Sequence, residues 1–551
     1  MRGIYTLLTG RKRNIYPVPE NTKSLFRDKL FKAKVFSIQG FGLRCIIIIW
    51  RLRLRKPYLL LFLLCLSLYL PASFLRSPIP PDEIRSIHIA QNMDTFKTLL
   101  IPTYLNQTYY DKPPLYFWAL KGLLSISKFN YLFFPTLFNI FISWIILSVN
   151  FAFFKKQGLE KTGLYSSLFL ATAVIFYGMS VLLRMDIFFL CFIFLSIFYF
   201  WKNRTEERIF YLMLSVLFGF LAVFTKGALG IIFPLFVQVV MSVLARDKKS
   251  LGKAIGVNFC VVAVCGLWIF SFSRIDPQYF GKMVIDQTFS RGFGQSRHAF
   301  LRLRSIFFYL PFLFLLFLPW SFFSIVYFFK IKRKKLDFWE KVYLWWFWGG
   351  FIILSLLRSK MEMYLLLLSV PFCGFAAKFF LEAKDKLKRK IFYAMSGFFA
   401  FMVTGGFIYS KIAGEFIPSF ASAVLIVFLA GFISIIKKPQ HIQFRNFFIV
   451  WVLFLQFANL FAMPMVSDYS ELKKIVKKVN SLDVQTDKIY TTERLYLVLP
   501  AYKDFKKEIV YWEKQTCPPD SCVLISLYET TKCRGNEIAN VGVNHFYYNK
   551  K

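Results

Sequence analysis

The segment DEIRSIHIAQNMDTFKTLLIPTYLNQTYYDKPPLYFW, residues 82–118, directly follows the first long apolar run of the chain. It begins with the carboxylates Asp82 and Glu83, and its last residues include a Lys112-Pro113-Pro114 turn. Charged groups next to a membrane-spanning helix cost free energy, and those that are present are usually functional. The segment therefore marks a candidate functional site at a membrane surface.

The composition of the whole chain is that of a polytopic membrane protein. Of its 551 residues, 57% are hydrophobic and 20% are aromatic, and soluble globular proteins are less apolar than this. The formal net charge is +40. A positive charge of this size is also typical of nucleic-acid-binding proteins. In membrane proteins, however, Lys and Arg gather in the cytoplasmic connections and set the orientation of the spans. The positions of the charges along the chain therefore decide between the two interpretations.

Apolar runs of about 20 residues, the length that crosses a bilayer, predict thirteen spans. They lie near residues 57–75, 131–154, 163–182, 187–201, 208–224, 228–245, 254–273, 306–329, 339–357, 363–381, 391–409, 417–436 and 444–464. Alternate connections are basic, which predicts that they and the N-terminus are cytoplasmic. The unusual polar motifs all fall in the other connections, so we expect one site on the outer face.

The two ends of the chain differ from its apolar middle. Residues 1–56 are strongly basic and predict a cytoplasmic or interfacial segment without a removed signal peptide. Residues 57–464 predict a transmembrane domain. Residues 465–551 are polar with short alternating runs, which predicts a small α/β-like domain outside the membrane.

The nine cysteines fall into two groups. Six lie in or beside apolar runs, where cysteine usually serves as a small packing residue: Cys45, Cys65, Cys191, Cys260, Cys265 and Cys373. The other three lie in the exported tail, where we favour a Cys517–Cys522 disulfide that leaves Cys533 free. Metal binding by these three is the alternative, but no fourth ligand stands at a suitable spacing.

Asp82 is the leading candidate for a general base. A carboxylate backed by a membrane can have its pKa raised toward neutrality, which suits that role. The alternative is that Asp82 and Glu83 cap a helix, because acids are favoured in the first turn; both roles can coexist. Arg85 follows on the same helical face, where it would orient Asp82 or touch a phosphate, or form a simple surface ion pair.

Two short breaks between apolar runs also carry charge. Arg184 and Asp186 stand in a gap too short for an idle loop, and such charges are functional by default. A purely structural Arg184–Asp186 pair is the alternative. In Thr225-Lys226-Gly227, the compact ammonium suits a phosphate, and the glycine allows close approach of the backbone.

The connection from Arg274 to Arg304 is basic although the topology places it outside. Arg291, Arg297 and His298 would neutralise a lipid phosphate or an anionic acceptor. The alternative for His298 is an interfacial hydrogen-bonding residue. Tyr364 would donate a hydrogen bond to a phosphate oxygen or belong to an aromatic belt.

These ordered motifs resemble those of the polyprenyl-phosphate-sugar glycosyltransferases, the family of protein O-mannosyltransferases and the bacterial lipid A aminoarabinose transferase. The resemblance covers residues 57 to about 375. In chain order the matching motifs are Asp82-Glu83, Asp111-Lys112-Pro113-Pro114, Asp186, Thr225-Lys226-Gly227, Arg297-His298, Tyr309-Leu310-Pro311-Phe312, Pro319-Trp320-Ser321 and Ser359-Lys360 with Tyr364 and Pro371.

The resemblance implies roles for individual residues. Catalytic roles fall on Asp82, Glu83 and Asp186; binding of the lipid phosphate or sugar falls on Arg85, Lys112, Lys226, Arg291, Arg297 and Tyr364. No cofactor is required, and Asp111 and His298 are the candidate ligands of an optional divalent metal. Gln287 and Thr288 stand where the family commonly carries a further histidine, which counts against that metal.

The implied fold is an all-α membrane glycosyltransferase of the GT-C type, with juxtamembrane helices in the first outer loop. The implied reaction moves a sugar from polyprenyl (undecaprenyl) phosphate to an envelope acceptor such as lipid A or lipopolysaccharide, with inversion. The reaction would take place on the outer face of a bacterial inner membrane. Nucleic acid is not an expected partner. The alternative is a transporter or flippase for a lipid-linked anionic sugar, which the one-sided motifs and the lack of visible repeats disfavour.

Overall fold

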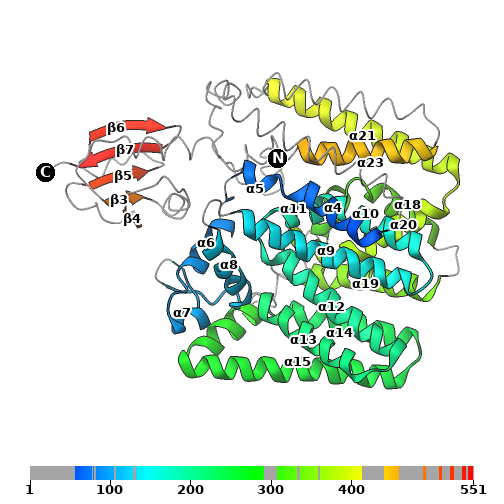
Figure 1. Cartoon of the computed structure of the whole chain (residues 1–551), viewed down its shortest axis with the longest axis horizontal. Coiled ribbons are helices and arrows are strands. Elements are labelled where there is room, and N and C mark those ends of the chain that lie inside the picture. Colours follow the sequence, from blue (N-terminus) through cyan, green and yellow to red (C-terminus); the bar gives the residue numbers. More distant parts are fainter. Residues whose placement is uncertain are drawn as a thin grey trace. The chain divides into compact units, whose positions relative to one another are not determined.

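The structure is a computed structural model that is predominantly helical (Figure 1). The residues that it describes are 56–290 without 77, 80–81, 105–106 and 128–131, then 307–331, 336–357, 360–412, 440–457, 459 and five strands between residues 488 and 549. Contacts divide the chain into two units. One holds Gln39–Met395 with Trp451–Ser467, and the other holds the remainder. The predicted boundaries at residues 56 and 464 stay predictions.

The first unit consists of helices joined by short connections. In chain order they are α4 (Pro57–Tyr69), α5 (Ala72–Leu75), α6 (Asp82–Gln91), α7 (Phe96–Leu100), α8 (Leu115–Ile126), α9 (Phe133–Lys155), α10 (Glu160–Thr172), α11 (Val174–Val181), α12 (Met185–Glu206), α13 (Ile209–Lys226), α14 (Leu229–Leu244), α15 (Lys248–Ile275), η1 (Phe280–Ser290), η2 (Phe307–Tyr309), α17 (Leu310–Leu316), α18 (Ser321–Ile331), α19 (Phe338–Leu356), η3 (Glu362–Leu368) and α20 (Ser369–Glu382). Two further helices, α21 (Asp385–Ile412) and α23 (Gln440–Phe457), contribute residues to both units.

Within the described residues, six helical segments are long and apolar enough to cross a membrane, or seven if α10 and α11 are counted as one bent span. The predicted count of thirteen spans remains a prediction, and residues 417–436 lie outside the described part. The predicted single span 163–182 is two helices bent by 61°. Around the bend, the Val174 amide donates to the carbonyl of Leu318 at 3.2 Å instead of continuing the helical ladder.

Burial differs strongly among these helices. The α12 segment is almost fully enclosed, whereas much of α15 is exposed, including the large side chains Phe259, Leu267 and Phe270. Exposed apolar side chains on a long apolar helix are typical of a surface that faces lipid. Buried Cys65, Cys191, Cys265 and Cys373 agree with the predicted packing role, whereas Cys260 is exposed.

Polar side chains join α12, α13, α14 and α15 inside this apolar bundle. Gln238 donates to the Ser215 hydroxyl at 3.2 Å, and Asn258 donates to the Gln238 side-chain oxygen at 2.7 Å. The hydroxyls of Ser196 and Ser215 donate to each other's backbone carbonyls. Such interhelical hydrogen bonds hold helices together where lipid offers no hydrophobic driving force.

The segment between α4 and α9 folds as predicted into short helices. It holds α6, α7 and α8, with a two-stranded hairpin of β1 (Thr103–Tyr104) and β2 (Gln107–Thr108). Thr95 and Thr98 form a capping box that begins α7. Because α6 packs on α8, the two ends of residues 82–118 are brought together.

The second unit contains a five-stranded sheet in the order β4-β3-β5-β7-β6 (Figure 1). Its strands are β3 (Lys488–Thr491), β4 (Glu508–Tyr511), β5 (Cys522–Ser526), β6 (Asn536–Val541) and β7 (Asn544–Asn549). β3 runs parallel to β4 and β5, while β7 is antiparallel to β5 and β6. Two predicted apolar runs, 488–490 and 522–525, are strands. The run 495–499 and the cysteine pairing lie outside what the structure describes.

The turn between α13 and α14 generates a first prediction. A Cβ added at Gly230 would lie 2.5 Å from the backbone nitrogen of Val223, so Gly230→Ala forces the two helices apart. We expect a loss of about 2 kcal/mol or more, measured as a lower melting temperature of the purified protein in detergent. Gly252→Ala is the matched control, because a Cβ there meets nothing within 4 Å. Equal melting temperatures of the two variants would contradict the prediction.

Candidate functional site

Five charged side chains from three helices and a turn form one cluster, here named the charge cluster: Asp82, Arg85, Arg184, Asp186 and Lys226. Asp82 and Arg85 lie in the first turns of α6, Arg184 precedes α12 and Asp186 lies in its first turn. Lys226 is the last residue of α13. Residues separated by up to 144 positions in the sequence are thereby connected.

Arg184 is the link between the two carboxylates. Its Nη1 donates to Asp82 Oδ2, and its Nε donates to Asp186 Oδ2 at 3.1 Å. The predicted Arg184–Asp186 pair is therefore present, but the same guanidinium also bridges to α6. The second oxygen of each carboxylate has its own cation, since Arg85 donates to Asp82 at 3.2 Å and Lys226 donates to Asp186.

The two carboxylates differ in how much solvent they reach. The side chain of Asp82 is 37% exposed, whereas that of Asp186 is 5% exposed. Solvent therefore reaches Asp82, while Asp186 is enclosed by its two cations. Three cations face two carboxylates, which leaves the cluster with a positive charge that suits a phosphate group.

Lys226 is held by aromatic side chains as well as by Asp186. Its Nζ lies 5.0 Å from the centre of the Tyr364 ring and 5.7 Å from that of Phe189, within the range of a cation–π contact. The structure thus places the predicted residue Tyr364 at the cluster. Gly227 then ends α13 with φ 85° and ψ −149°, a backbone conformation that is essentially restricted to glycine.

Glu83 lies beside this cluster but has different partners. It forms a bidentate pair with Arg76 at 2.6 and 2.7 Å and accepts the amides of Ile79 and Leu183. Arg76 also donates to the carbonyl of Val181 at 2.9 Å. Both side chains are almost fully buried. Arg76 was not among the predicted residues. It is, however, a single arginine between the first apolar run and Asp82, and a charge next to an apolar run is the same pattern that led to the prediction of Arg184 and Lys226.

Tyr109 connects the charge cluster with the Lys-Pro-Pro turn. Burial, followed by the nearby Asp111 carboxylate, raises the pKa of Tyr109 to about 12. Burial lowers the pKa of Arg85, but Tyr109 and Asp82 outweigh this and raise it. Lys112 Nζ donates to the backbone carbonyl of Asp111 at 3.0 Å. Tyr109 therefore lies between Asp111 and Arg85 in the network of interacting side chains.

The remaining predicted residues, Arg291, Arg297 and His298, lie outside the part of the chain that the structure describes. Within that part, no group of three His, Cys, Asp or Glu side chains is close enough together to hold a metal ion. Asp111 and His298 therefore stay predicted ligands of an optional metal.

Comparisons with known proteins show what the chain as a whole is similar to. The model of the dolichyl-phosphate-mannose-protein mannosyltransferase family matches residues 111–270, a range that contains Lys112, Asp186 and Lys226. The structure of ArnT from Cupriavidus metallidurans bound to undecaprenyl phosphate superposes with a TM-score of 0.71 at 15% identity, covering 90% of this chain and 98% of that one. The chain is a glycosyltransferase that resembles the polyprenyl-phosphate-sugar transferases.

Two relatives of this glycosyltransferase show how far the similarity extends. An uncharacterised protein of Aquifex aeolicus is 24% identical over 459 residues, which cover 82% of this chain and 87% of the relative. An undecaprenyl phosphate-alpha-4-amino-4-deoxy-L-arabinose arabinosyl transferase of Proteus mirabilis is 24% identical over 379 residues, 66% of this chain and 67% of the relative. Sequence similarity to these two relatives thus covers most of the chain.

The buried Arg76–Glu83 pair generates a second prediction. Glu83→Gln leaves the Arg76 guanidinium buried without its carboxylate, so we expect a loss of about 3 kcal/mol in the free energy of unfolding. Glu160→Gln is the control, because Glu160 is exposed and pairs with Lys155 at 3.3 Å, and exposed pairs contribute less than about 1 kcal/mol. Thermal unfolding of both variants measures the difference. Similar melting temperatures would show that the pair does not anchor α6.

His88 on α6 generates a prediction about pH. Burial lowers the pKa of His88 from 6.5 to about 4, and its ring contacts Asn92 and Tyr104. The unfolded chain therefore binds a proton between pH 6.5 and 4 that the folded protein does not, so stability falls as the pH drops through this window. His88→Gln removes the contribution. We expect the wild type to lose more thermal stability than His88→Gln between pH 7.5 and pH 5; equal losses would contradict this.

Proposed function

We propose that this glycosyltransferase moves a sugar from a polyprenyl phosphate, such as undecaprenyl phosphate, to a lipid or glycan acceptor of the bacterial envelope, such as lipid A or lipopolysaccharide. The observation that carries the proposal is the charge cluster, in which a partly exposed Asp82 stands beside the cations Arg85 and Arg184. The ArnT fold and the arabinosyl transferase relatives support the donor class.

The chemistry of the transfer matches the charges of the cluster. The acceptor hydroxyl attacks the anomeric carbon of the sugar, the bond from that carbon to the phosphate oxygen breaks, and the anomeric configuration inverts. The hydroxyl proton goes to the Asp82 carboxylate. The leaving polyprenyl phosphate gains one negative charge, and fixed cations that face this charge lower the barrier.

The three predicted catalytic carboxylates receive different roles in this proposal. Asp82 is the base, because it alone of the three has a substantially exposed carboxylate. Asp186 holds Arg184 and Lys226 in place, and Glu83 fixes α6. Lys112, Lys226 and Tyr364 serve the donor phosphate or sugar, and we assign Arg291 and Arg297 the same role from the sequence.

We also infer the orientation and the number of spans. The connections after alternate apolar runs are basic, which supports thirteen spans with a cytoplasmic N-terminus. The charge cluster then faces the periplasm, with a small α/β-like domain after residue 464 on the same side. A lipid-linked donor and an envelope acceptor are both accessible from that face.

Asp82→Asn tests the proposal. The amide keeps the size of the side chain but cannot take the proton, so we expect transfer to fall by about 10²- to 10⁴-fold while binding of undecaprenyl phosphate is retained. The measurement is mass spectrometry of lipid A and total envelope glycans, in cells with matched protein levels. A sugar-sized mass present only with the wild type would identify both the sugar and the acceptor.

Asp94→Asn is the matched control for this test. Asp94 lies in the same segment but is highly exposed, and its partner is Lys121 at 2.8 Å, away from the charge cluster. We expect this variant to keep the wild-type glycan profile. If Asp82→Asn also keeps that profile, Asp82 is not the base, and the transporter or flippase alternative gains support.

A further inference from the structure

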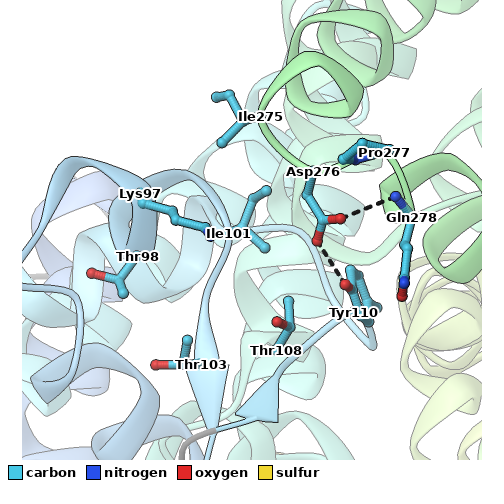
Figure 2. A pocket seen from close by; sticks show the side chains of 10 residues that line it. All are labelled: Lys97, Thr98, Ile101, Thr103, Thr108, Tyr110, Ile275, Asp276, Pro277 and Gln278. Atoms are coloured by element: carbon cyan, nitrogen blue, oxygen red, sulfur yellow. Dashed lines mark hydrogen bonds between the residues drawn. The ribbon is translucent and has the colours of Figure 1, made fainter.

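A second polar site lies in a cavity of about 530 Å³ next to the β1–β2 hairpin, here named the hairpin pocket. Its walls come from α7, from the hairpin and from the turn after α15 (Figure 2). Small-molecule sites typically have volumes of about 300–1,000 Å³. None of the charge-cluster residues lines this pocket. We propose that the hairpin pocket binds a neutral, hydroxyl-rich saccharide portion of the acceptor, an inference that rests on the proposed transfer reaction.

The hairpin contributes two hydroxyl groups to the pocket. Thr103 and Thr108 are directly opposite each other in the antiparallel pairing, so their side chains leave the same face of the hairpin. Both line the cavity, together with Thr98 from α7 (Figure 2). A threonine hydroxyl both donates and accepts hydrogen bonds, which is what a sugar with many hydroxyls requires.

Asp276 provides a carboxylate that is already oriented. Its Oδ2 accepts a hydrogen bond from the Tyr110 hydroxyl at 2.6 Å, and its Oδ1 accepts one from the Gln278 amide at 3.0 Å (Figure 2). An ionised carboxylate offers about four acceptor positions. These two bonds fix the group and leave capacity for sugar hydroxyls on the pocket side.

The floor of the pocket is apolar and tightly packed. Ile101 is buried in a cluster with Phe224, Trp268 and Tyr279, and the Tyr110 ring packs edge-on against Tyr279. Phe224 lies two residues before Lys226 on α13. The same apolar cluster therefore supports the hairpin pocket and the end of the helix that carries Lys226 into the charge cluster.

The charges of the pocket argue for a neutral ligand. Asp276 repels a phosphate, and the cation that lines the same cavity, Lys97, is an exposed side chain. Ile275 and Pro277 supply exposed apolar surface for the C–H faces of a sugar ring. A mixture of hydroxyl groups, one carboxylate and apolar patches is suited to a saccharide and not to the donor phosphate.

The test uses the double variant Thr103→Val/Thr108→Val in the full-length protein. Valine keeps the shape of threonine and is favoured in strands, so the hairpin is expected to persist without its hydroxyls. The probe is N,N′-diacetylchitobiose, titrated onto the detergent-solubilised protein and detected by saturation-transfer difference NMR. Loss of two hydrogen bonds should weaken binding about tenfold, while the affinity for undecaprenyl phosphate stays unchanged.

Gln107→Leu is the matched control, because Gln107 pairs with Tyr104 at the neighbouring position of the same hairpin and does not line the cavity. It should bind the probe like the wild type. Equal probe affinity in the double variant and the wild type, or no binding to the wild type, would overturn the inference. Failure of the proposed transfer reaction gives a different result. In that case Asp82→Asn leaves the glycan profile unchanged, whether or not the saccharide probe binds.

Discussion

The buried ion pair of Arg76 and Glu83 is the constraint on which the geometry of the site depends. The helix α11 ends at Val181, and the carbonyl of Val181 and the amide of Leu183 lie at a turn between two enclosed helices. Backbone groups in such a place must find partners within the protein. Arg76 donates a hydrogen bond to the carbonyl of Val181, and Glu83 accepts one from the amide of Leu183. One ion pair therefore caps the turn and also fixes α6 to it.

The charge cluster follows from this attachment, because Glu83 is next to Asp82 and Leu183 is next to Arg184. Once Glu83 binds the amide of Leu183, Asp82 and Arg184 are close enough to form their ion pair. The backbone adds to the stability of the arrangement. Asp82 and Asp186 lie in the first turns of α6 and α12, whose N-termini favour negative charge, and Lys226 ends α13, whose C-terminus favours positive charge.

Local patterns in the sequence predicted the parts of this site that depend on local structure. The helical spacing of Asp82 and Arg85 predicted their pair, and the charged breaks between apolar runs identified Arg184, Asp186 and Lys226. The sequence did not predict that Arg184 bridges to Asp82, or that Glu83 pairs with Arg76 and caps a turn 100 residues away. Those contacts depend on how the helices pack, which hydrophobic periodicity does not encode. The bend at Ala173 was missed for the same reason, since the amide of the next residue, Val174, donates to the carbonyl of Leu318.

The enclosure of Asp186 follows from the need to fix Lys226. A lysine at a helix end next to a membrane would otherwise extend its long side chain toward water. Asp186 and the Tyr364 ring hold the ammonium in one place instead. A buried ion pair contributes little net stability, because desolvation offsets the attraction. In the proposed reaction the pair would serve to position Lys226, since a cation that is already in place needs no reorganisation when a phosphate gains charge.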